Sequence, residues 1–198
     1  AYSPLPWAPE NLVAEVTKRM LQPMVDAMRN RGTPFVGLLY AGLALTSRGT
    51  RVIEFNARFG DPETQVVLAR LASPLGRVLM AAATGRLADL PPLAWHPHAA
   101  LTVVVAAANY PENPRTGDVI TGIADANAVA GVQVLHAGTA LNAQGELVSA
   151  GGRVLSVTAT GDSLAEARDR AYLAIDHLAI PGAHYRRDIA KIAAAEST

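Results

Sequence analysis

Hydrophobic positions recur at helical spacing in the first part of the chain. Between Glu10 and Arg31, apolar residues four apart form a stripe that predicts one helix ending at Gly32: Leu12, Val16, Met20, Met24 and Met28. Pro23 lies inside this stretch and should kink the helix or remove one of its hydrogen bonds. Residues 1–9 carry three prolines and no periodic pattern, which indicates an extended segment.

The pattern then changes from helical to strand spacing. Two apolar segments, Phe35–Thr46 and Arg51–Asn56, flank a short glycine-containing connection, as is typical of an antiparallel hairpin. The run 61–63, Asp-Pro-Glu, has the residue types of a helix start and predicts a helix through Leu71. A second helix is expected over Leu75–Thr84.

Periodicity is lost between Gly85 and Pro97, where prolines cluster. Downstream, five short β-type segments predict a mostly antiparallel sheet: Leu101–Ala107, Asp118–Thr121, Val132–Ala137, Glu146–Ser149 and Val154–Thr158. Ser163 and Glu166 form a capping box that opens a C-terminal helix, and the alanine-rich tail after Ala190 is expected to fray. These elements predict an α+β protein with one domain over residues 1–90, a linker over 91–98 and a small second domain over 99–198.

Composition narrows the classes of protein that fit this pattern. The 198 residues are 50% hydrophobic, with 17 Lys and Arg against 17 Asp and Glu and no cysteine. A chain this apolar should bury a sizeable core, which argues against disorder. A formal charge of zero argues against nucleic acid as a partner, and no apolar run reaches the length of a membrane span. We therefore expect a cytoplasmic protein with no membrane partner.

The candidate chemistry lies where the second hairpin strand ends. Glu54 and Asn56 interrupt an apolar strand pattern and are two residues apart, so their side chains share a face with Cα atoms roughly 6 to 7 Å apart. One carboxylate and one amide oxygen suit Mg²⁺, which takes its other ligands from water and substrate phosphates. Alternatively, Glu54 faces water on a half-exposed strand.

Other residues are weaker candidates. Arg58 could reach the same place and grip phosphate or carboxylate oxygens, or pair with Glu54 at the surface. Asp61 is either a substrate contact or only a helix cap. Gly151 and Gly152 are most simply a turn, and the basic cluster His184–Arg187 is either a solvated edge or a face turned to substrate.

Several longer runs resemble one enzyme family. Residues 37–43 and 52–65, including Val-Ile-Glu-Phe-Asn-Ala-Arg-Phe-Gly-Asp-Pro-Glu, resemble the ATP-grasp core of glycinamide ribonucleotide synthetases, also called phosphoribosylamine-glycine ligases. Residues 110–111, 115–120, 136–139 and 151–155 look like the C-terminal domain of that family. The resemblance implies the second half of an ATP-grasp core followed by a small antiparallel sheet domain.

The family resemblance also implies a reaction and its participants. ATP phosphorylates glycine, and the amine of 5-phosphoribosylamine attacks the glycyl phosphate to give glycinamide ribonucleotide for purine biosynthesis. Glu54 and Asn56 match the positions of the metal ligands, for Mg²⁺ or Mn²⁺, while Arg58 and Asp61 match motif positions, as a catalytic and substrate-binding residue and a substrate-binding residue. The resemblance covers only the latter half of such an enzyme, so we expect the missing N-terminal half to be a partner and this chain alone to be inactive.

Two alternatives remain open from the residues alone. Another ATP-grasp ligase or carboxylase would share the metal pair and differ in the acceptor. A non-catalytic interaction fragment would use the same sheet and helices for assembly only.

Overall fold

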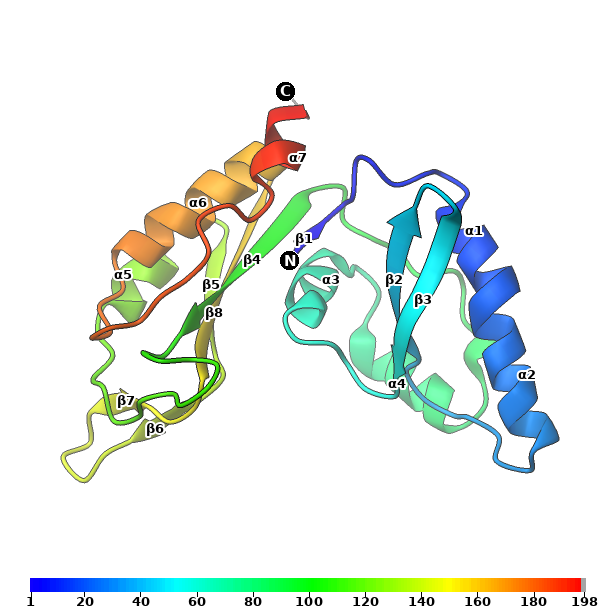
Figure 1. Cartoon of the computed structure of the whole chain (residues 1–198), viewed down its shortest axis with the longest axis horizontal. Helices are drawn as coiled ribbons and strands as arrows, with labels where there is room; N and C mark the ends of the chain where they lie inside the picture. The colour runs from blue at the N-terminus through cyan, green and yellow to red at the C-terminus, as the bar shows by residue number, and fades with distance from the viewer. Residues whose placement is uncertain (197–198) are drawn as a thin grey trace. The chain divides into compact units, whose positions relative to one another are not determined.

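The computed structural model describes residues 1–196, which form two compact units (Figure 1). We call one the sheet unit, made of Ala1–Pro6, Pro62–Arg70 and the chain from His96 onward. The other is the hairpin unit, made of Trp7–Asp61 and Leu71–Trp95. The domain division at residues 91–98 stays a prediction. Two segments that precede it, Ala1–Pro6 and Pro62–Arg70, belong to the same compact unit as the chain from His96 onward.

The sheet unit is built on four antiparallel strands in the order β1, β4, β8 and β5 (Figure 1). A separate ladder pairs β6 with β7. The predicted mostly antiparallel sheet is therefore confirmed. The strand bounds are β1 (Tyr2–Ser3), β4 (Ala99–Ala106), β5 (Val132–His136), β6 (Thr139–Leu141), β7 (Leu147–Ser149) and β8 (Arg153–Gly161).

The predicted strand Asp118–Thr121 is wrong. Val119 and Thr121 make only isolated bridges, to two different segments of the chain. Gly117 and Gly122 flank the segment with positive φ angles of 87° and 83°, so the backbone turns away before a ladder can extend. The next residues form a short helix, α5 (Ile123–Ala128), which the sequence pattern did not indicate.

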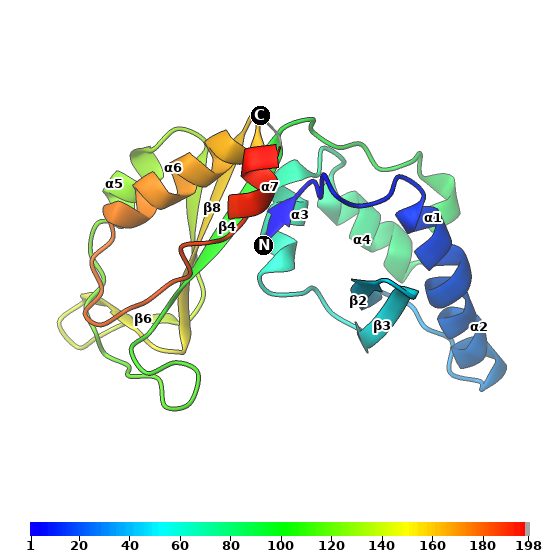
Figure 2. The same ribbon diagram turned by 45° about the horizontal axis from the view of Figure 1, so that its top comes forward.

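Helix α6 (Leu164–Asp176) covers one face of the sheet (Figure 2). Its buried alanines pack against alternate residues of β4 and β8, including Leu101, Val103 and Val157. The predicted capping box is confirmed, because the Ser163 hydroxyl accepts from the Glu166 amide at 3.1 Å. Burial of this face forms the main core of the unit.

The opposite face of β4 and β8 carries buried polar side chains, among them Thr102, Ser156 and Thr158. Thr102 and Thr158 share a buried hydrogen bond of 2.9 Å between their hydroxyls. Helix α3 (Glu63–Arg70) contacts both strands, and Gln65 donates from Nε2 to the Ser156 hydroxyl at 3.4 Å. The predicted helix start after Asp61 is thus confirmed, and the helix belongs to the sheet unit.

The expected fraying after Ala190 is wrong for the described residues. Helix α7 (Lys191–Glu196) forms there, and Ala193 and Ala194 are buried in a cluster with Ala99 and Leu164. Alanine lets this helix approach closely enough to bury its small side chains. Residues 197–198 of the tail lie outside the described part.

The hairpin unit contains the predicted long helix in three pieces: α1 (Leu12–Val16), the π-helix η1 (Thr17–Leu21) and α2 (Gln22–Asn30). The π-turn comes directly before Pro23, and the Gln22 amide bonds the Thr17 carbonyl five residues back. Because proline has no amide to continue the ladder, a local widening of the helix accommodates it. Gly32 ends the helix with φ of 77°, as expected.

The remaining elements of the hairpin unit are the hairpin itself and two short helices. Strands β2 (Tyr40–Thr46) and β3 (Gly49–Asn56) pair in antiparallel fashion, which confirms the hairpin, although β2 begins later than the predicted Phe35. Helices α4 (Leu75–Ala83) and η2 (Leu87–Asp89) follow. Among residues 1–196, no helix has both the length and the apolar character that crossing a membrane requires.

Candidate functional site

Glu54 and Asn56 lie on one face of β3 and touch each other. Asn56 donates from Nδ2 to Glu54 Oε1 at 2.9 Å, which confirms the proximity that their spacing predicted. Glu54 is exposed and Asn56 is partly buried. The two side chains therefore present their polar ends to solvent as a pair.

The strand opposite explains how Glu54 fits. Gly42 of β2 is the register partner of Glu54, and a Cβ at Gly42 would lie 3.1 Å from Glu54 Cγ. A larger residue at this position would press on the glutamate, since 3.1 Å is tighter than an ordinary carbon contact. Gly42 thus leaves room for the carboxylate side chain on the hairpin surface.

The donor set of this pair fits a hard divalent cation. A carboxylate and an amide oxygen are suitable ligands for Mg²⁺, and turning the Asn56 amide over would aim its oxygen where its nitrogen now donates. Among the described residues, no group of three or more His, Asp or Glu side chains could hold an ion. A metal here would therefore need substrate phosphate and water to complete its shell.

Arg58 and Asp61 follow the pair along the chain. Arg58 is exposed, and its Nη1 donates to the Phe59 carbonyl at 3.1 Å. Within the part of the chain that the structure describes, no ion pair joins Arg58 to Glu54. Asp61 is exposed two residues before α3 begins. Their substrate roles stay predictions.

A cavity of about 390 Å³ lies in the sheet unit. Its lining includes both backbone of β4 and side chains from distant parts of the chain: Thr102, Val104, Tyr110, Arg153, His184 and Arg186. Sequence reasoning missed it, although the basic run 184–187 was its one visible signal. The cavity is assembled by tertiary contacts that no short motif encodes.

Gly151 and Gly152 have packing roles beside this cavity. A Cβ at Gly152 would overlap the ring of Tyr110, and Gly138 approaches Gly151 so closely that a Cβ on Gly138 would lie 2.8 Å from the Gly151 Cα. Arg153 follows directly and donates from Nε to the Tyr110 hydroxyl at 3.2 Å. The two glycines therefore allow close backbone approach, in agreement with the turn interpretation.

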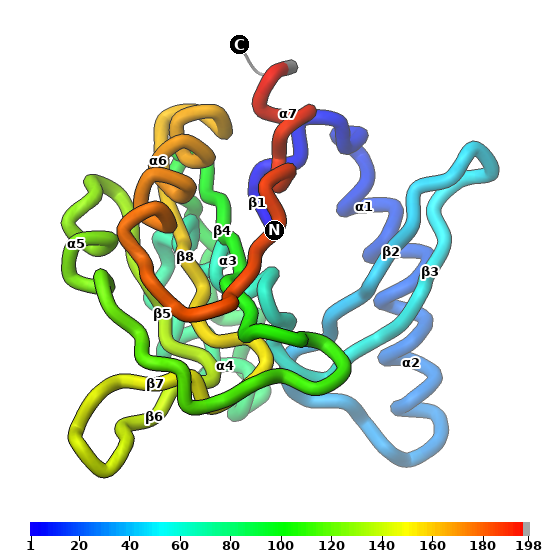
Figure 3. Tube along the Cα trace, turned by 60° about the vertical axis from the view of Figure 1, so that its left-hand side comes forward, coloured from blue at the N-terminus to red at the C-terminus, as the bar shows by residue number. Residues whose placement is uncertain are grey.

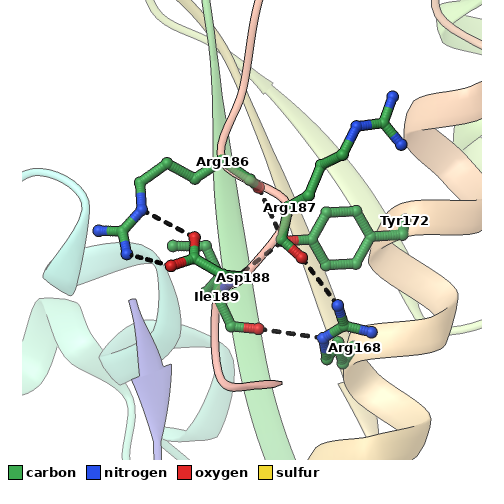
Figure 4. Close-up of polar contacts among 6 residues, drawn as sticks. All are labelled: Arg168, Tyr172, Arg186, Arg187, Asp188 and Ile189. Carbon is green, nitrogen blue, oxygen red and sulfur yellow. Dashed lines mark hydrogen bonds and ion pairs between the residues drawn. The ribbon is translucent and has the colours of Figure 1, made fainter. Parts of the chain in front are cut away.

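Helix α6 holds the backbone of the segment that leads to α7 (Figure 4). Arg168 donates to the carbonyls of Arg187 and Ile189 at 2.8 and 3.2 Å. The Tyr172 hydroxyl donates to the Arg186 carbonyl at 2.8 Å and accepts from the Ile189 amide at 3.3 Å. Four hydrogen bonds from two side chains thus fix residues 186–189.

Charge pairing also orients the side chains of this segment. Arg186 makes a two-point ion pair with Asp188, at 2.9 and 2.7 Å, and the hydrogen bonds from Arg186 lower the pKa of Asp188. Burial raises the pKa of Tyr172. Figure 4 shows Arg186 and Arg187 pointing to opposite sides of the segment.

Comparisons with known proteins divide the chain into two matched parts. Residues 1–64 match the family model described as phosphoribosylglycinamide synthetase, ATP-grasp (A) domain. Residues 100–192 match the model described as phosphoribosylglycinamide synthetase, C domain. The fold class is accordingly that of ATP-grasp proteins, and Glu54, Asn56, Arg58 and Asp61 all lie within the first match.

Solved structures agree with this class. The chain is similar to a phosphoribosylamine-glycine ligase of Thermotoga maritima, with a TM-score of 0.82 and 29% identity, over 95% of this chain and 45% of that one. An N5-carboxyaminoimidazole ribonucleotide synthetase of the same organism, with a TM-score of 0.58 and 16% identity over 88% of this chain and 44% of that one, shares the fold alone.

Curated relatives define the family. A phosphoribosylamine-glycine ligase of Streptomyces coelicolor is 66% identical over 197 residues, 98% of this chain and 47% of the relative. One of Mycobacterium tuberculosis is 53% identical over 189 residues, 96% of this chain and 43% of the relative. The chain belongs to the phosphoribosylglycinamide synthetase family. It spans just under half the length of these relatives.

Proposed function

We propose that the protein containing this chain joins glycine to 5-phosphoribosylamine at the expense of ATP, giving glycinamide ribonucleotide in purine biosynthesis. The observation that carries this proposal is the Glu54 and Asn56 pair, in hydrogen-bond contact within the part that matches the family's ATP-grasp domain. Family membership supports the choice of glycine and phosphoribosylamine over the substrates of other ATP-grasp enzymes.

The proposed reaction has two balanced steps. A carboxylate oxygen of glycine attacks the terminal phosphorus of ATP, so that ADP leaves and glycyl phosphate forms. The amine of phosphoribosylamine then attacks the glycyl carbonyl carbon, the carbon–oxygen bond to phosphate breaks, and an amine proton is lost. Phosphate and glycinamide ribonucleotide are the products.

In this proposal, Glu54 and Asn56 are the residues that hold the metal. When bound, Mg²⁺ or Mn²⁺ supplies positive charge against the oxygens of the transferring phosphoryl group. Glu54 contributes a charged oxygen and Asn56 a neutral one, so the pair binds an ion most strongly when phosphates are also present. Cytoplasmic placement remains part of the same proposal.

We assign Arg58 a role in stabilising the transferring phosphoryl or acyl phosphate. Its guanidinium is exposed and, among the described residues, makes one hydrogen bond, from Nη1 to the Phe59 carbonyl, which leaves other donors available for a phosphate. Arg58→Lys keeps the charge and loses the planar fork. We expect turnover to fall roughly tenfold or more with unchanged thermal stability. If the variant loses stability and its folded fraction stays fully active, Arg58 is only a structural residue.

A full-length chimera tests the proposed function, because this chain spans under half of its relatives. The matching part of the Streptomyces coelicolor protein is replaced by this chain, and glycinamide ribonucleotide and phosphate are measured with ATP, glycine and phosphoribosylamine. We expect steady turnover from the chimera and none from the 198-residue chain alone. A folded chimera that hydrolyses ATP without consuming glycine would contradict the proposal.

A further inference from the structure

Helix α4 and the segment that follows it form a groove within the hairpin unit. The helix comes after α3 along the chain, beyond a short connection that can be traced in Figure 3. Helical spacing places Arg77, Ala81 and Thr84 on one face, with Met80 beside them. This face is one wall of a cavity of about 330 Å³, which we call the α4 groove.

The opposite wall of the α4 groove exists because the chain reverses at Gly85. This glycine has a φ of 70°, and its amide donates to the carbonyl three residues back at 3.2 Å. The Arg86 amide donates to the Ala81 carbonyl at 2.7 Å, which completes the Schellman ending of the helix. The reversal brings Arg86, Asp89 and Leu90 into the lining. Since all lining residues lie between positions 77 and 90, one continuous stretch of chain forms the groove.

Two arginines and one aspartate give the α4 groove its charge. Arg86 Nε donates to Asp89 Oδ2 at 2.7 Å, which leaves both Nη groups of this arginine outside the ion pair. Among residues 1–196, the Arg77 side chain makes no hydrogen bond or ion pair, so its planar fork of donors is available. The lining therefore carries one net positive charge, which matches a single anionic group.

The rest of the lining is largely apolar. Met80 is 65% exposed, Leu90 is partly buried and Ala81 is buried. The Met80 carbonyl accepts from the Thr84 hydroxyl at 2.8 Å, and the Ala81 carbonyl accepts from the Arg86 amide. These backbone acceptors at the end of α4 are thus already occupied. The groove offers cationic donors beside apolar surface.

We propose that the α4 groove binds a small organic carboxylate that carries an apolar body. The guanidinium fork of Arg77 matches a planar carboxylate in two-point geometry, and the free Nη groups of Arg86 add a second cation. Met80 and Leu90 contact the apolar body. A phosphate monoester carries close to two negative charges, which this lining does not balance. A volume of about 330 Å³ is at the small end of ligand cavities.

Hexanoate is the probe, and its binding to the full-length chimera is followed by the ¹³C signal of the Met80 methyl group. The signal is identified by its loss in Met80→Leu. We expect hexanoate to shift it saturably, with half-saturation on the order of 1 mM for so small a ligand. Hexanamide has the same shape without the charge, and acetate has the charge without the chain. Each of these should shift the Met80 signal far less than hexanoate.

Substitutions of the charged lining residues should change hexanoate binding in opposite directions. Arg77→Gln removes the fork and its charge, and we expect roughly tenfold weaker binding. Asp89→Asn removes the opposing carboxylate and releases Arg86, so binding should tighten roughly threefold. Arg19→Gln, which changes an exposed arginine of the same unit, should leave binding unchanged. Because Arg77 and Asp89 are exposed, their variants should melt at the wild-type temperature.

Four results would overturn the inference. Equal binding of hexanamide would show an apolar contact without a carboxylate site, and unchanged binding in Arg77→Gln would show that the fork plays no part. Inorganic phosphate that displaces hexanoate at lower concentration would show a general anion site. A Met80 signal that hexanoate does not shift in the chimera would show that the groove is closed to the probe. Ligation of glycine by the chimera is measured separately, so the proposed function stands or falls independently.

Discussion

The two units of this chain bury their apolar residues to very different degrees. In the sheet unit, Leu101, Val154, Leu155 and Val157 have essentially no exposed surface. In the hairpin unit, the only buried apolar side chains among the described residues are Val16 and Ala81, and both keep some exposed surface. Many of its larger apolar side chains are exposed: Trp7, Val13, Val36, Leu38, Leu45, Val52, Ile53, Phe59, Leu79, Met80, Leu87, Leu93 and Trp95.

This difference separates the unit that contains the larger core from the unit that carries the proposed metal pair. The sheet unit is held by a four-stranded ladder covered by α6. The hairpin unit holds Glu54 and Asn56 on a two-stranded ladder, which is marginal in isolation. The register of this ladder and Gly42 position the Glu54 and Asn56 side chains, whereas long-range contacts between distant parts of the chain form the cavity of the sheet unit.

Deleting one buried side chain should affect the sheet unit most strongly. Leu155→Ala removes a side chain with no exposed surface, and we expect a loss of about 2 to 5 kcal/mol of unfolding free energy. Ile53→Ala, at 71% exposure in the hairpin unit, should change it by less than about 0.5 kcal/mol. Denaturant unfolding followed by far-ultraviolet circular dichroism checks both values. Equal losses of unfolding free energy in the two variants would contradict the difference in burial between the two units.

Glycine substitutions sharpen the comparison with a smaller expected effect. A Cβ on Gly152 would overlap the Tyr110 ring, so Gly152→Ala should cost about 1 to 3 kcal/mol and displace Tyr110 from Arg153. The matched control is Gly76→Ala in α4, where a Cβ meets nothing within 4 Å and should stabilise by about 0.5 to 1 kcal/mol. Thermal unfolding shows whether each variant melts below or above the wild type. If Gly152→Ala leaves the melting temperature unchanged, the Tyr110 ring can move aside and the packing role of Gly152 is contradicted.

Local rules explain what the sequence predicted correctly. The capping box of Ser163 and Glu166, the hairpin and the contact of Glu54 with Asn56 each depend on residues close in sequence, where spacing alone defines the geometry. The family resemblance was likewise visible in short contiguous runs. The local geometric rules and the family motifs can therefore each be recognised within a single contiguous segment of the sequence.

Long-range pairing explains what the sequence did not predict. The Ala106 bridge to His184 joins residues far apart in the chain, so the basic run 184–187 could not by itself reveal the cavity on β4. Helix α7 was missed because its alanines carry no amphipathic pattern and are held by burial against Leu164 and Ala99. Asp118–Thr121 has strand-forming residues, but the segment itself turns at the flanking Gly117 and Gly122 before a ladder can extend. The roles of Arg58 and Asp61 stay predictions.

The metal pair is the central claim, and Glu54→Gln in the chimera tests it most directly. The substitution keeps volume and the contact with Asn56 while removing the charge that would bind Mg²⁺. Glu10→Gln, an exposed carboxylate of the same unit, is the matched control.

Turnover is measured against Mg²⁺ concentration at saturating ATP, together with the melting temperature. We expect Glu54→Gln to lower turnover by roughly 100-fold or more and to raise the Mg²⁺ concentration needed for half-maximal rate. Its melting temperature should equal that of the wild type. Glu10→Gln should match wild type in all three. Near-wild-type turnover of Glu54→Gln at ordinary Mg²⁺ would contradict the account.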